Sequence, residues 1–545
     1  MNSSAEKQAA GNADIDNSQS TNHQSGSNGT NPPPQPHPVE SPKEQTEEEP
    51  FRLNAWPYES LSHIHELCFI ILICCSQLLT QAAFGQTLIP YQPLAKGLGV
   101  SSPGQLAWTV ASYSLTVGTF VLPAGRLGDM YGSKRMLIIG WVWFGIWSIV
   151  AGLSVLVPLS RSGGSSGRVI MFCVSQALRG IGPAILLPNA VAIIGRSYPN
   201  GQRKNLVFAG FAMCAPLGAF VGAVFGGIFG QLAWWPWTMW SLGIAALGLG
   251  LAATFIIPAD KAEQIQQDQH FDFVGALLGV AGLILFNVAW NQATVVGWPE
   301  AYVPVLLTLG ILILAAFFLW ESRIEQPLLP SSIFKPGTVV ILLVTSLGWQ
   351  SFGVFTFYLV QFLTNIRGTT PLGTVAQLAT IAISGGAAAI VTGLSIRFIP
   401  SHWLITISAS AFTVGNILLA TMPAHQTYWA QAFVGLLIIP FGMDISFPAA
   451  SLVLSDMVPP HLQGVAASLV NTVINYSISI GLGVAGTAER EVSLGGATLL
   501  EGYHVALYVG VGMAGGSLVI AVGFALYMQF VGNRRAAGKQ ESELE

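Results

Sequence analysis

The sequence predicts an all-α membrane protein with about fourteen transmembrane helices. Charged residues make up only 9% of the 545-residue chain, whereas soluble proteins carry roughly 25%. Apolar residues make up 52%, and the mean hydropathy is +0.58. Apolar stretches of roughly 20 residues recur along the chain, and each can cross a hydrocarbon core of ~30 Å. A surface with so few charges must face lipid rather than water.

Residues 1–64 differ in composition from the rest of the chain. They are rich in Ser, Asn, Gln, Pro and Glu, with a proline-rich stretch at 32–38 and an acidic run at 47–49. Such a segment buries too little apolar surface to offset its ordering entropy, so we expect a disordered cytoplasmic tail. The proline-rich stretch is either a plain linker or a ligand for an SH3 domain. The net charge of -4, with much of the acid in this tail, gives no indication of nucleic-acid binding.

The apolar segments after this tail divide the chain further. We expect an N-terminal six-helix bundle at 65–258, a linker with two inserted helices at 259–335, a C-terminal six-helix bundle at 336–532 and a cytoplasmic tail at 533–545. The predicted spans are 67–89, 105–124, 136–158, 169–193, 206–229, 233–257, 273–293, 302–321, 338–363, 374–396, 403–422, 428–451, 465–487 and 503–531.

Basic residues predict the orientation of these spans. With the N-terminus in the cytoplasm, 16 of the 22 Lys and Arg residues fall on the cytoplasmic side and 5 on the other, while Arg179 lies inside a span. Cytoplasmic loops carry an excess of Lys and Arg, so both termini are expected to be cytoplasmic.

No pattern in the sequence indicates an enzyme. No Ser/His/Asp, Cys/His, zinc or phosphate-binding motif stands out, so we expect no catalytic residue, no metal site and no cofactor. The cysteines fall inside apolar runs without metal-ligand spacing, which is typical of small core residues. They are Cys68, Cys74, Cys75, Cys173 and Cys214.

The most specific motif lies between the second and third spans, where residues 125–135 read GRLGDMYGSKR. Its glycines permit a tight turn and close helix approach, and an acid lies among basic residues at the edge of the bilayer. An ordinary positive loop is the alternative. The motif resembles the signature loop of the major facilitator superfamily. The resemblance implies a switch during alternating access, with the residues Gly125, Asp129, Gly132, Lys134 and Arg135.

A weaker echo, residues 393–397 (GLSIR), follows the tenth span. It lacks the acid, but its position supports a repeat of six helices in each half. With two helices inserted between the halves, the layout resembles the fourteen-helix drug:proton antiporter family.

Arg179 lies deep in the fourth span, within the stretch QALRGIGPA. A guanidinium in lipid costs ~3 kcal/mol or more, so it persists only with a partner or a water-filled cavity. The alternative is an arginine that reaches the membrane surface. The stretch resembles the fourth-helix motif of the family, and this resemblance implies a role for Arg179 in proton coupling.

The fifth span carries Pro216, Gly218, Gly222 and Gly226, with Gly230 one turn further on. Glycines four residues apart form a groove against which another helix packs closely, and the proline bends the helix. Tight packing alone is one explanation of this pattern. The pattern also resembles the antiporter motif of the family, although Ala215 stands where that motif has glycine.

Asp444 lies within an apolar span between Pro440 and Pro448. Removal from water disfavours the charged form of a carboxyl group, so Asp444 is a candidate to bind and release the coupling proton. Two structural roles remain open, as a partner for Arg179 or as a hydrogen-bonding group at a helix break. In the first span, Gln81 stands where the family commonly has an acid, and Gln86 stands where it has Asn. Coupling has therefore moved to Asp444, or the protein depends less on protons than its relatives.

The first inserted span carries Asn287, Trp290 and Asn291 on one face. Polar groups on one face need partners in lipid, which favours packing against the main bundle. The stretch 290–298 resembles a fungal subgroup that includes aminotriazole- and boron-resistance exporters and low-affinity ammonium transporters. Further candidates for a central substrate cavity are Gln81, Gln86, Asn189, Trp349, Gln350, Gln361, Asn365, Asn416, Asn471 and Asn475.

Together these features predict a secondary transporter, a proton-coupled exporter of small toxic compounds or metabolites that confers multidrug resistance. The alternative is an importer or facilitator of a small cation such as ammonium. Its expected partners are a small-molecule substrate, protons and the lipid bilayer, with no nucleic acid. We expect a monomer in the plasma membrane, with the vacuolar membrane as the alternative.

Overall fold

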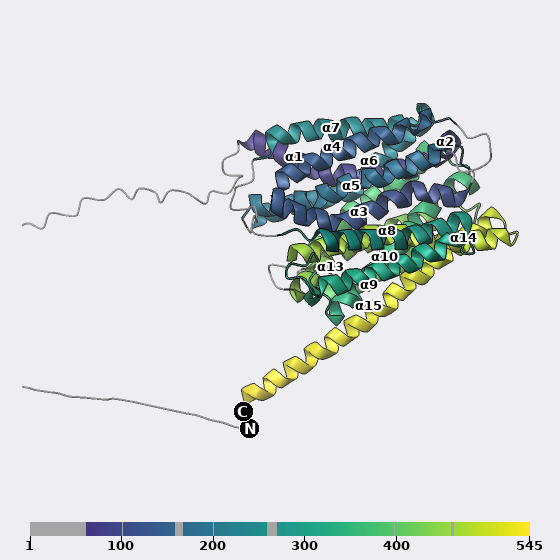
Figure 1. The fold of residues 1–545 in the computed structure, drawn as a ribbon. Coiled ribbons are helices and arrows are strands. Elements are labelled where there is room, and N and C mark those ends of the chain that lie inside the picture. The colour runs from purple at the N-terminus through teal and green to yellow at the C-terminus, as the bar shows by residue number, and fades with distance from the viewer. Residues whose placement is uncertain are drawn as a thin grey trace, which may run out of the picture. The chain divides into compact units, whose positions relative to one another are not determined.

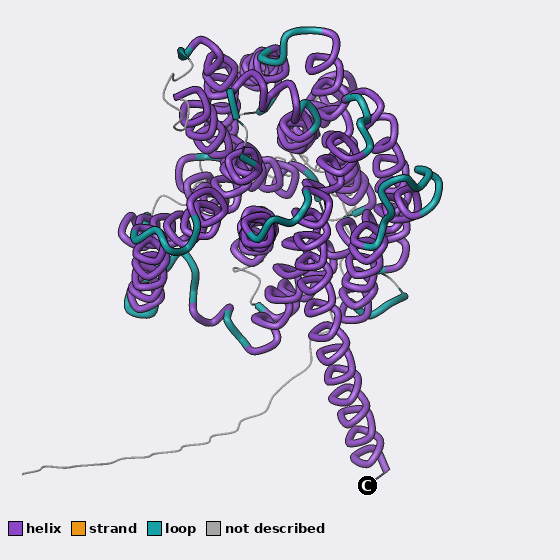
Figure 2. The backbone as a smooth tube through the Cα atoms, turned by 90° about the vertical axis from the view of Figure 1, so that its right-hand side faces the viewer, coloured by secondary structure: helices purple, strands orange, loops and turns teal. Residues whose placement is uncertain are grey.

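The computed structural model describes residues 62–100, 102–158, 167–199, 201–258, 270–396, 398–458 and 463–544. Helices dominate these residues, and short loops join them (Figure 2). Fourteen of the helices are long and apolar enough to span a membrane, which confirms the predicted fold class. Most of the predicted tail 1–64, the linker 259–269 and Arg397 of the second-half echo lie outside the described residues.

The first-half helices (α1–α7) come before the linker. They are α1 (His63–Leu88), α2 (Tyr91–Leu98), α3 (Pro103–Tyr131), α4 (Ser133–Leu153), α5 (Gly167–Ser197), α6 (Gln202–Leu232) and α7 (Trp237–Ile256). The inserted helices are α8 (Phe273–Val296) and α9 (Tyr302–Glu321). The second-half helices (α10–α15) are α10 (Pro336–Gln361), α11 (Pro371–Ser395), α12 (Ser401–Ala420), α13 (Gln431–Met457), α14 (Gln463–Leu494) and α15 (Leu499–Leu544), with a π-helical turn, η5 (Phe362–Ile366), after α10.

Local sequence signals set several of the helix ends. Ser62 caps α1 by accepting a hydrogen bond from the backbone of His65, and Thr370 caps α11 in the same way. Pro336 occupies the first turn of α10, where its missing N–H has no intrahelical acceptor to lose. Gly132 joins α3 to α4 at φ 96°, a conformation that other residues rarely adopt.

Each half packs mainly within itself. In the first half, α1 packs on α6, α3 on α5, and α4 on both α5 and α7. In the second half, α10 packs on α14 and α15, and α12 packs on α13 and α15. Two seams join the halves, α3 against α14 and α6 against α11. The exact domain limits predicted from the sequence stay a prediction.

The inserted helices lie against both halves. α8 and α9 pack on each other, and α8 also contacts α3 and α14 along the first seam (Figure 1). Gly104 of α3 and Gly483 of α14 allow this approach, because a side chain at either position would meet the backbone of α8 within 3.0 Å. The inserted pair is therefore part of the packed bundle.

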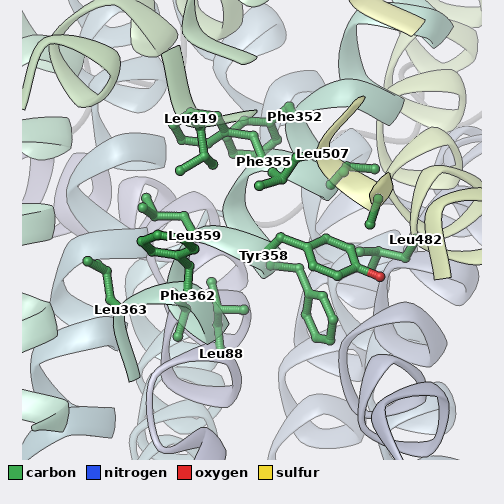
Figure 3. Packing of buried hydrophobic residues seen from close by; sticks show 14 of the residues in the cluster. Leu88, Phe352, Phe355, Tyr358, Leu359, Phe362, Leu363, Leu419, Leu482 and Leu507 are labelled. Atoms are coloured by element: carbon green, nitrogen blue, oxygen red, sulfur yellow. The ribbon is translucent and has the colours of Figure 1, made fainter. Parts of the chain in front are cut away.

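Apolar packing holds the two halves together at one end of the bundle. There, Leu88 of α1 belongs to the same buried cluster as Phe355, Tyr358 and Leu359 of α10 and Leu482 of α14 (Figure 3). This end is opposite Gly132, because α1 runs toward it and α3 runs back from it. We call it the α2 end, after the short helix that lies there.

Two elements differ from the expectation. α2 was not predicted as a helix, because its eight residues follow Pro90 and are too short and too polar to register as a span. α15 continues to Leu544 and includes most of the predicted tail 533–545. Ala, Lys, Gln and Glu favour helix, so residues past the last apolar turn extend it.

Candidate functional site

The signature loop places Asp129 at the C-terminal end of α3. Its carboxylate pairs with Arg196 at the end of α5, with 2.6 Å between Oδ1 and Nη2. Arg196 also donates to Ser133 Oγ, at the start of α4, at 3.1 Å. Lys134 donates to the carbonyls of Thr254 and Ile257 at the end of α7, where a cation offsets the helix dipole. The loop therefore connects α3, α4, α5 and α7 at one end of the first half.

A second ion pair at this end was not anticipated from the sequence. Glu66, in the first turn of α1, is buried and pairs with Arg203 of α6. Tyr198 donates to the same carboxylate at 3.0 Å. The acid at the very start of the first apolar segment was the available signal. Two ion pairs thus close the first half at the signature-loop end.

Arg179 is fully buried in α5. Its Nη1 donates to Gln176 Oε1 at 2.8 Å and to the Met239 sulfur at 3.1 Å. The guanidinium lies 5.7 Å from the ring centre of Tyr113 and 5.4 Å from that of Phe144, distances at which aromatic rings attract a cation. Its Nε and Nη2 have no hydrogen-bond partner among the described residues.

Asp444 does not contact Arg179. Its Oδ2 is shielded from solvent and has no hydrogen-bond partner in the described part of the chain. A side chain at Gly385 of α11 would begin 3.3 Å from this oxygen and 2.8 Å from Pro216 of α6. Asp444 therefore lies at the seam between α6 and α11, beside the proline of the antiporter motif.

The glycines of α6 bring its backbone against α1. A side chain at Gly218 would begin 2.2 Å from the Leu78 carbonyl oxygen, and one at Gly222 would begin 2.0 Å from that of Ala82. Gly226 meets Gln86 less closely, at 3.0 Å. The groove predicted from the sequence is thus occupied by α1 of the same half.

The two glutamines of α1 lie in different surroundings. Gln86 is buried and its Nε2 has no partner in the described structure, whereas Gln81 is half-buried. The residue after Gln86, Thr87, accepts a hydrogen bond from Gln176, which also binds Arg179. A polar path therefore runs from α1 to the buried arginine of α5.

Some predicted cavity residues lie along the second half's inner helices. Trp349 donates from its indole to Ser446, two residues after Asp444, at 3.0 Å. Gln350 bonds Ser346, which in turn meets Ser477 of α14. Asn471 and Asn475 of α14 are half-buried and bond carbonyls of their own helix, so their oxygens stay available.

Two other candidates pack inside the protein. Asn189 is buried, donates to the Ile185 carbonyl at 2.7 Å and lies against Gly128 of the signature loop. Asn416 is buried in α12 and donates to the Phe412 carbonyl. Their positions indicate helix packing in this conformation.

Gln361 and Asn365 join the two halves at the α2 end. Gln361 Oε1 accepts hydrogen bonds from Tyr91 of α2 at 2.5 Å and from Tyr503 of α15 at 3.0 Å. Asn365 donates to Tyr503 and accepts from Gln92 of α2. A cavity of about 390 Å³ lies at this join, lined by Tyr91, Gln92, Ala95, Lys96, Val100, Leu106, Asn365, Leu499 and Tyr503.

The polar face of α8 meets α14. Asn291 donates to Asn287 Oδ1 at 2.8 Å and to Ser479 of α14, whose hydroxyl donates to Asn287 in return. Trp290 packs edge-on against Trp298. These contacts agree with the packing role expected from the sequence.

Comparisons with known proteins agree with this architecture. Residues 70–482 match the Major Facilitator Superfamily. The low affinity ammonium transporter of Saccharomyces cerevisiae is 46% identical, covering 88% of this chain and 92% of that protein. A major facilitator superfamily multidrug transporter of Aspergillus fumigatus is 43% identical, covering 85% of this chain and 80% of that protein.

Solved structures share the fold at low identity. The crystal structure of the human organic anion transporter MFSD10 has a TM-score of 0.56 and 14% identity, and the match covers 84% of this chain and 99% of that one. With a family match over most of its length and fourteen helices able to span a membrane, the chain belongs to the major facilitator superfamily and is a multi-pass membrane transporter.

Proposed function

We propose that the chain is a proton-coupled exporter of small toxic compounds or metabolites and that Asp444 carries the proton. The observation behind this proposal is the unpartnered Oδ2 of Asp444 at the α6–α11 seam. A carboxyl group shielded from water and without a cation is most stable when it is neutral. Rocking of the two halves would change the exposure of this seam, so each cycle would let Asp444 bind a proton on one side and release it on the other.

Arg179 belongs to the same proposal as a fixed positive charge in the first half. Two of its nitrogens have no hydrogen-bond partner in the described structure, which is costly for a buried guanidinium. An anionic group that reaches these nitrogens in another conformation would be strongly stabilised. The positive charge of Arg179 would then stabilise the negative charge that appears when Asp444 releases its proton. The cavity candidates Gln350, Asn471 and Asn475 would meet the substrate between these two groups.

The signature loop would serve as the conformational switch. Its ion pair between Asp129 and Arg196 ties α3 to α5 at one end of the bundle. We place this end, and both termini, in the cytoplasm because most basic residues lie on that side. The protein would act as a monomer in the plasma membrane, with the vacuolar membrane as the alternative.

The test uses yeast that lacks its own carriers of this subgroup and expresses the chain. Growth is scored on aminotriazole, borate and several drugs, and toxicant inside the cells is measured with and without a proton gradient. The exporter should lower intracellular toxicant, and collapse of the gradient should abolish the effect. Asp444→Asn should remove the gradient-dependent part, whereas Asp444→Glu, which keeps a titratable group, should retain much of it. Full gradient-driven export by Asp444→Asn at normal surface levels would refute the role of Asp444.

A second candidate function is uptake of a small cation such as ammonium. The 46% identity to a low affinity ammonium transporter supports it, as do the amides of Gln81 and Gln86 at positions where the family commonly has an acid and an Asn. Uptake of labelled methylammonium in the same cells separates the two. Raised uptake without resistance would favour the importer.

A further inference from the structure

A second buried carboxyl group lies far from Asp444, at the α2 end. Glu489, near the end of α14, is 5% exposed. Tyr358 of α10 donates its hydroxyl to Glu489 Oε2 at 2.6 Å. The hydroxyl of Tyr358 lies beside Leu482 of α14, within the apolar cluster that joins the halves (Figure 3). A phenol is the one hydrogen-bond partner that the described structure gives this carboxyl group.

The helices around Glu489 present no cation to it. α10 offers Tyr358, α15 offers Tyr503, and α2 offers Tyr91, all neutral phenols near this carboxyl group. His504, the next residue of α15, stacks instead on Phe362, with 6.4 Å between the ring centroids. α8 carries no titratable residue between Phe273 and Val296, and on the near half of α3 the titratable residue Tyr113 donates to Thr80. The charged side chains nearby have other partners or face solvent. Arg490 donates to the Val296 carbonyl and to Glu491, and Glu501 accepts from Thr498. Lys96 is exposed at the neighbouring cavity.

These phenols form one network with Gln361, and Tyr91 connects it to the first half. The rings of Tyr358 and Tyr503 pack edge-on with centroids 5.7 Å apart. Tyr503 and Tyr91 both donate to the amide oxygen of Gln361. Tyr91 belongs to the first half, whereas Tyr358, Tyr503 and Gln361 belong to the second, so the Tyr91–Gln361 bond crosses the join between the halves. The π-helical turn η5 follows Gln361 directly, and such turns often mark functional sites.

We propose that Glu489 is a second proton-binding residue and that the α2 end of the transporter closes only when Glu489 carries a proton. The proposal rests on the proposed proton coupling and extends it to a second site. Parting of Tyr91 from Gln361 would open the cavity beside Tyr503 and admit water toward Glu489. Water stabilises the charged carboxylate of Glu489 when the α2 end is open. When that end is closed, one neutral hydroxyl group is its hydrogen-bond partner, so the charged form is less stable.

The direction of the pH effect follows from this difference. Closure favours the neutral form of Glu489, so the closed state binds the proton more tightly than the open state. The stability of the closed state is therefore greatest at low pH and falls as the pH rises. A proton taken up at the open α2 end would allow that end to close. The transporter could then open at the opposite end with Glu489 protonated.

A distance measurement across the cavity tests this proposal without substrate or proton gradient. The native cysteines, all in the first half, are replaced by serine. Lys96→Cys on α2 and Leu499→Cys on α15, which belong to different halves and both line the cavity, carry spin labels. Electron–electron resonance in nanodiscs between pH 5 and pH 9 should show one short distance at low pH and a growing longer distance as the pH rises.

Three variants identify the responsible group. Glu489→Gln, which is neutral at every pH, should keep the short distance throughout. Glu491→Gln, two residues along and exposed, should follow the parent protein. Tyr358→Phe removes the donor that stabilises the carboxylate, so its transition should move up by roughly one pH unit. A parental pH profile in Glu489→Gln, or no pH-dependent distance in the parent protein, would overturn the proposal.

The outcomes also separate this inference from the proposed role of Asp444. Asp444→Asn in the labelled background should show the parental distance profile, because Asp444 lies at the α6–α11 seam. If Asp444→Asn loses the pH dependence of the distance and Glu489→Gln keeps it, the transition belongs to Asp444, and the inference is refuted. If Glu489→Gln fails to fold, an unchanged midpoint in Tyr358→Phe overturns the inference instead.

Discussion

A methyl group on Gly222 should force α1 and α6 apart. The new carbon would lie 2.0 Å from the carbonyl oxygen of Ala82 and 2.5 Å from its Cα, whereas ordinary contacts begin near 3.4 Å. Both neighbours are backbone atoms, so no change of side-chain rotamer can relieve the clash. The helices must separate by more than an ångström, or one of them must bend.

The cost can be worked from this geometry. Overpacking in a rigid core typically costs 1–3 kcal/mol, and a clash with backbone belongs at the upper end, at about 3 kcal/mol. Alanine favours helix over glycine by about 1 kcal/mol, which offsets part of this cost. Gly222→Ala should therefore destabilise the protein by about 2 kcal/mol. Gly210→Ala is the matched control in the same helix, because no atom lies within 4 Å of its added carbon.

The difference in stability is measured by heating the purified transporter in detergent. Unfolding is monitored as the loss of the monodisperse peak in size-exclusion chromatography. Gly210→Ala should match or exceed the midpoint of the parent protein, and Gly222→Ala should fall several degrees below it. Equal midpoints for the two variants would show that α1 and α6 can part without cost. The close packing of the antiporter-motif glycines would then have no role in stability.

Two further predictions concern polar contacts. Asp129→Asn removes one charge of a partly exposed ion pair with Arg196, which is worth at most about 1 kcal/mol. Transport should fall sharply while the melting temperature changes little. A large loss of stability would contradict a switching role. Asn291→Leu removes the buried amide that joins α8 to Ser479, at a cost of about 1–2 kcal/mol, so the melting temperature should fall. Gln292→Leu on the neighbouring face removes one exposed hydrogen bond to Tyr302 and should lower the melting temperature less.

Hydropathy and motif spacing predicted the number of spans and the position of the signature turn well, because both depend on local sequence. Each span needs only enough apolar residues to cross lipid, and Gly132 is needed at the turn for its positive φ. Partners of charged residues could not be predicted in this way. Asp129 binds Arg196, 67 residues away, and Glu66 binds Arg203, 137 residues away, so packing between helices decides both.

Glu489 shows a second limit of sequence reasoning. The span was predicted to end at residue 487, just before the charged residues Glu489, Arg490 and Glu491. The helix instead continues to Leu494, and only the first of these three side chains turns inward. Likewise, the amides of Asn189 and Gln361 looked equivalent in sequence, but one packs against the signature loop and the other bridges the halves.

The acidic groups lie at three levels of the bundle, and their partners differ in a way that bears on the transport cycle. Asp129 and Glu66, at the signature-loop end, are each paired with an arginine. Asp444 and Glu489 have no ion-pair partner among the described residues, so both can be expected to exchange protons as their exposure changes. The proposed closure of the α2 end depends on the proton of Glu489 and not on Asp444, so the two carboxyl groups would act as separate proton sites at different depths. Glu489 would then govern closure at the α2 end and Asp444 the coupling to export, while the paired acids hold helices of the first half together.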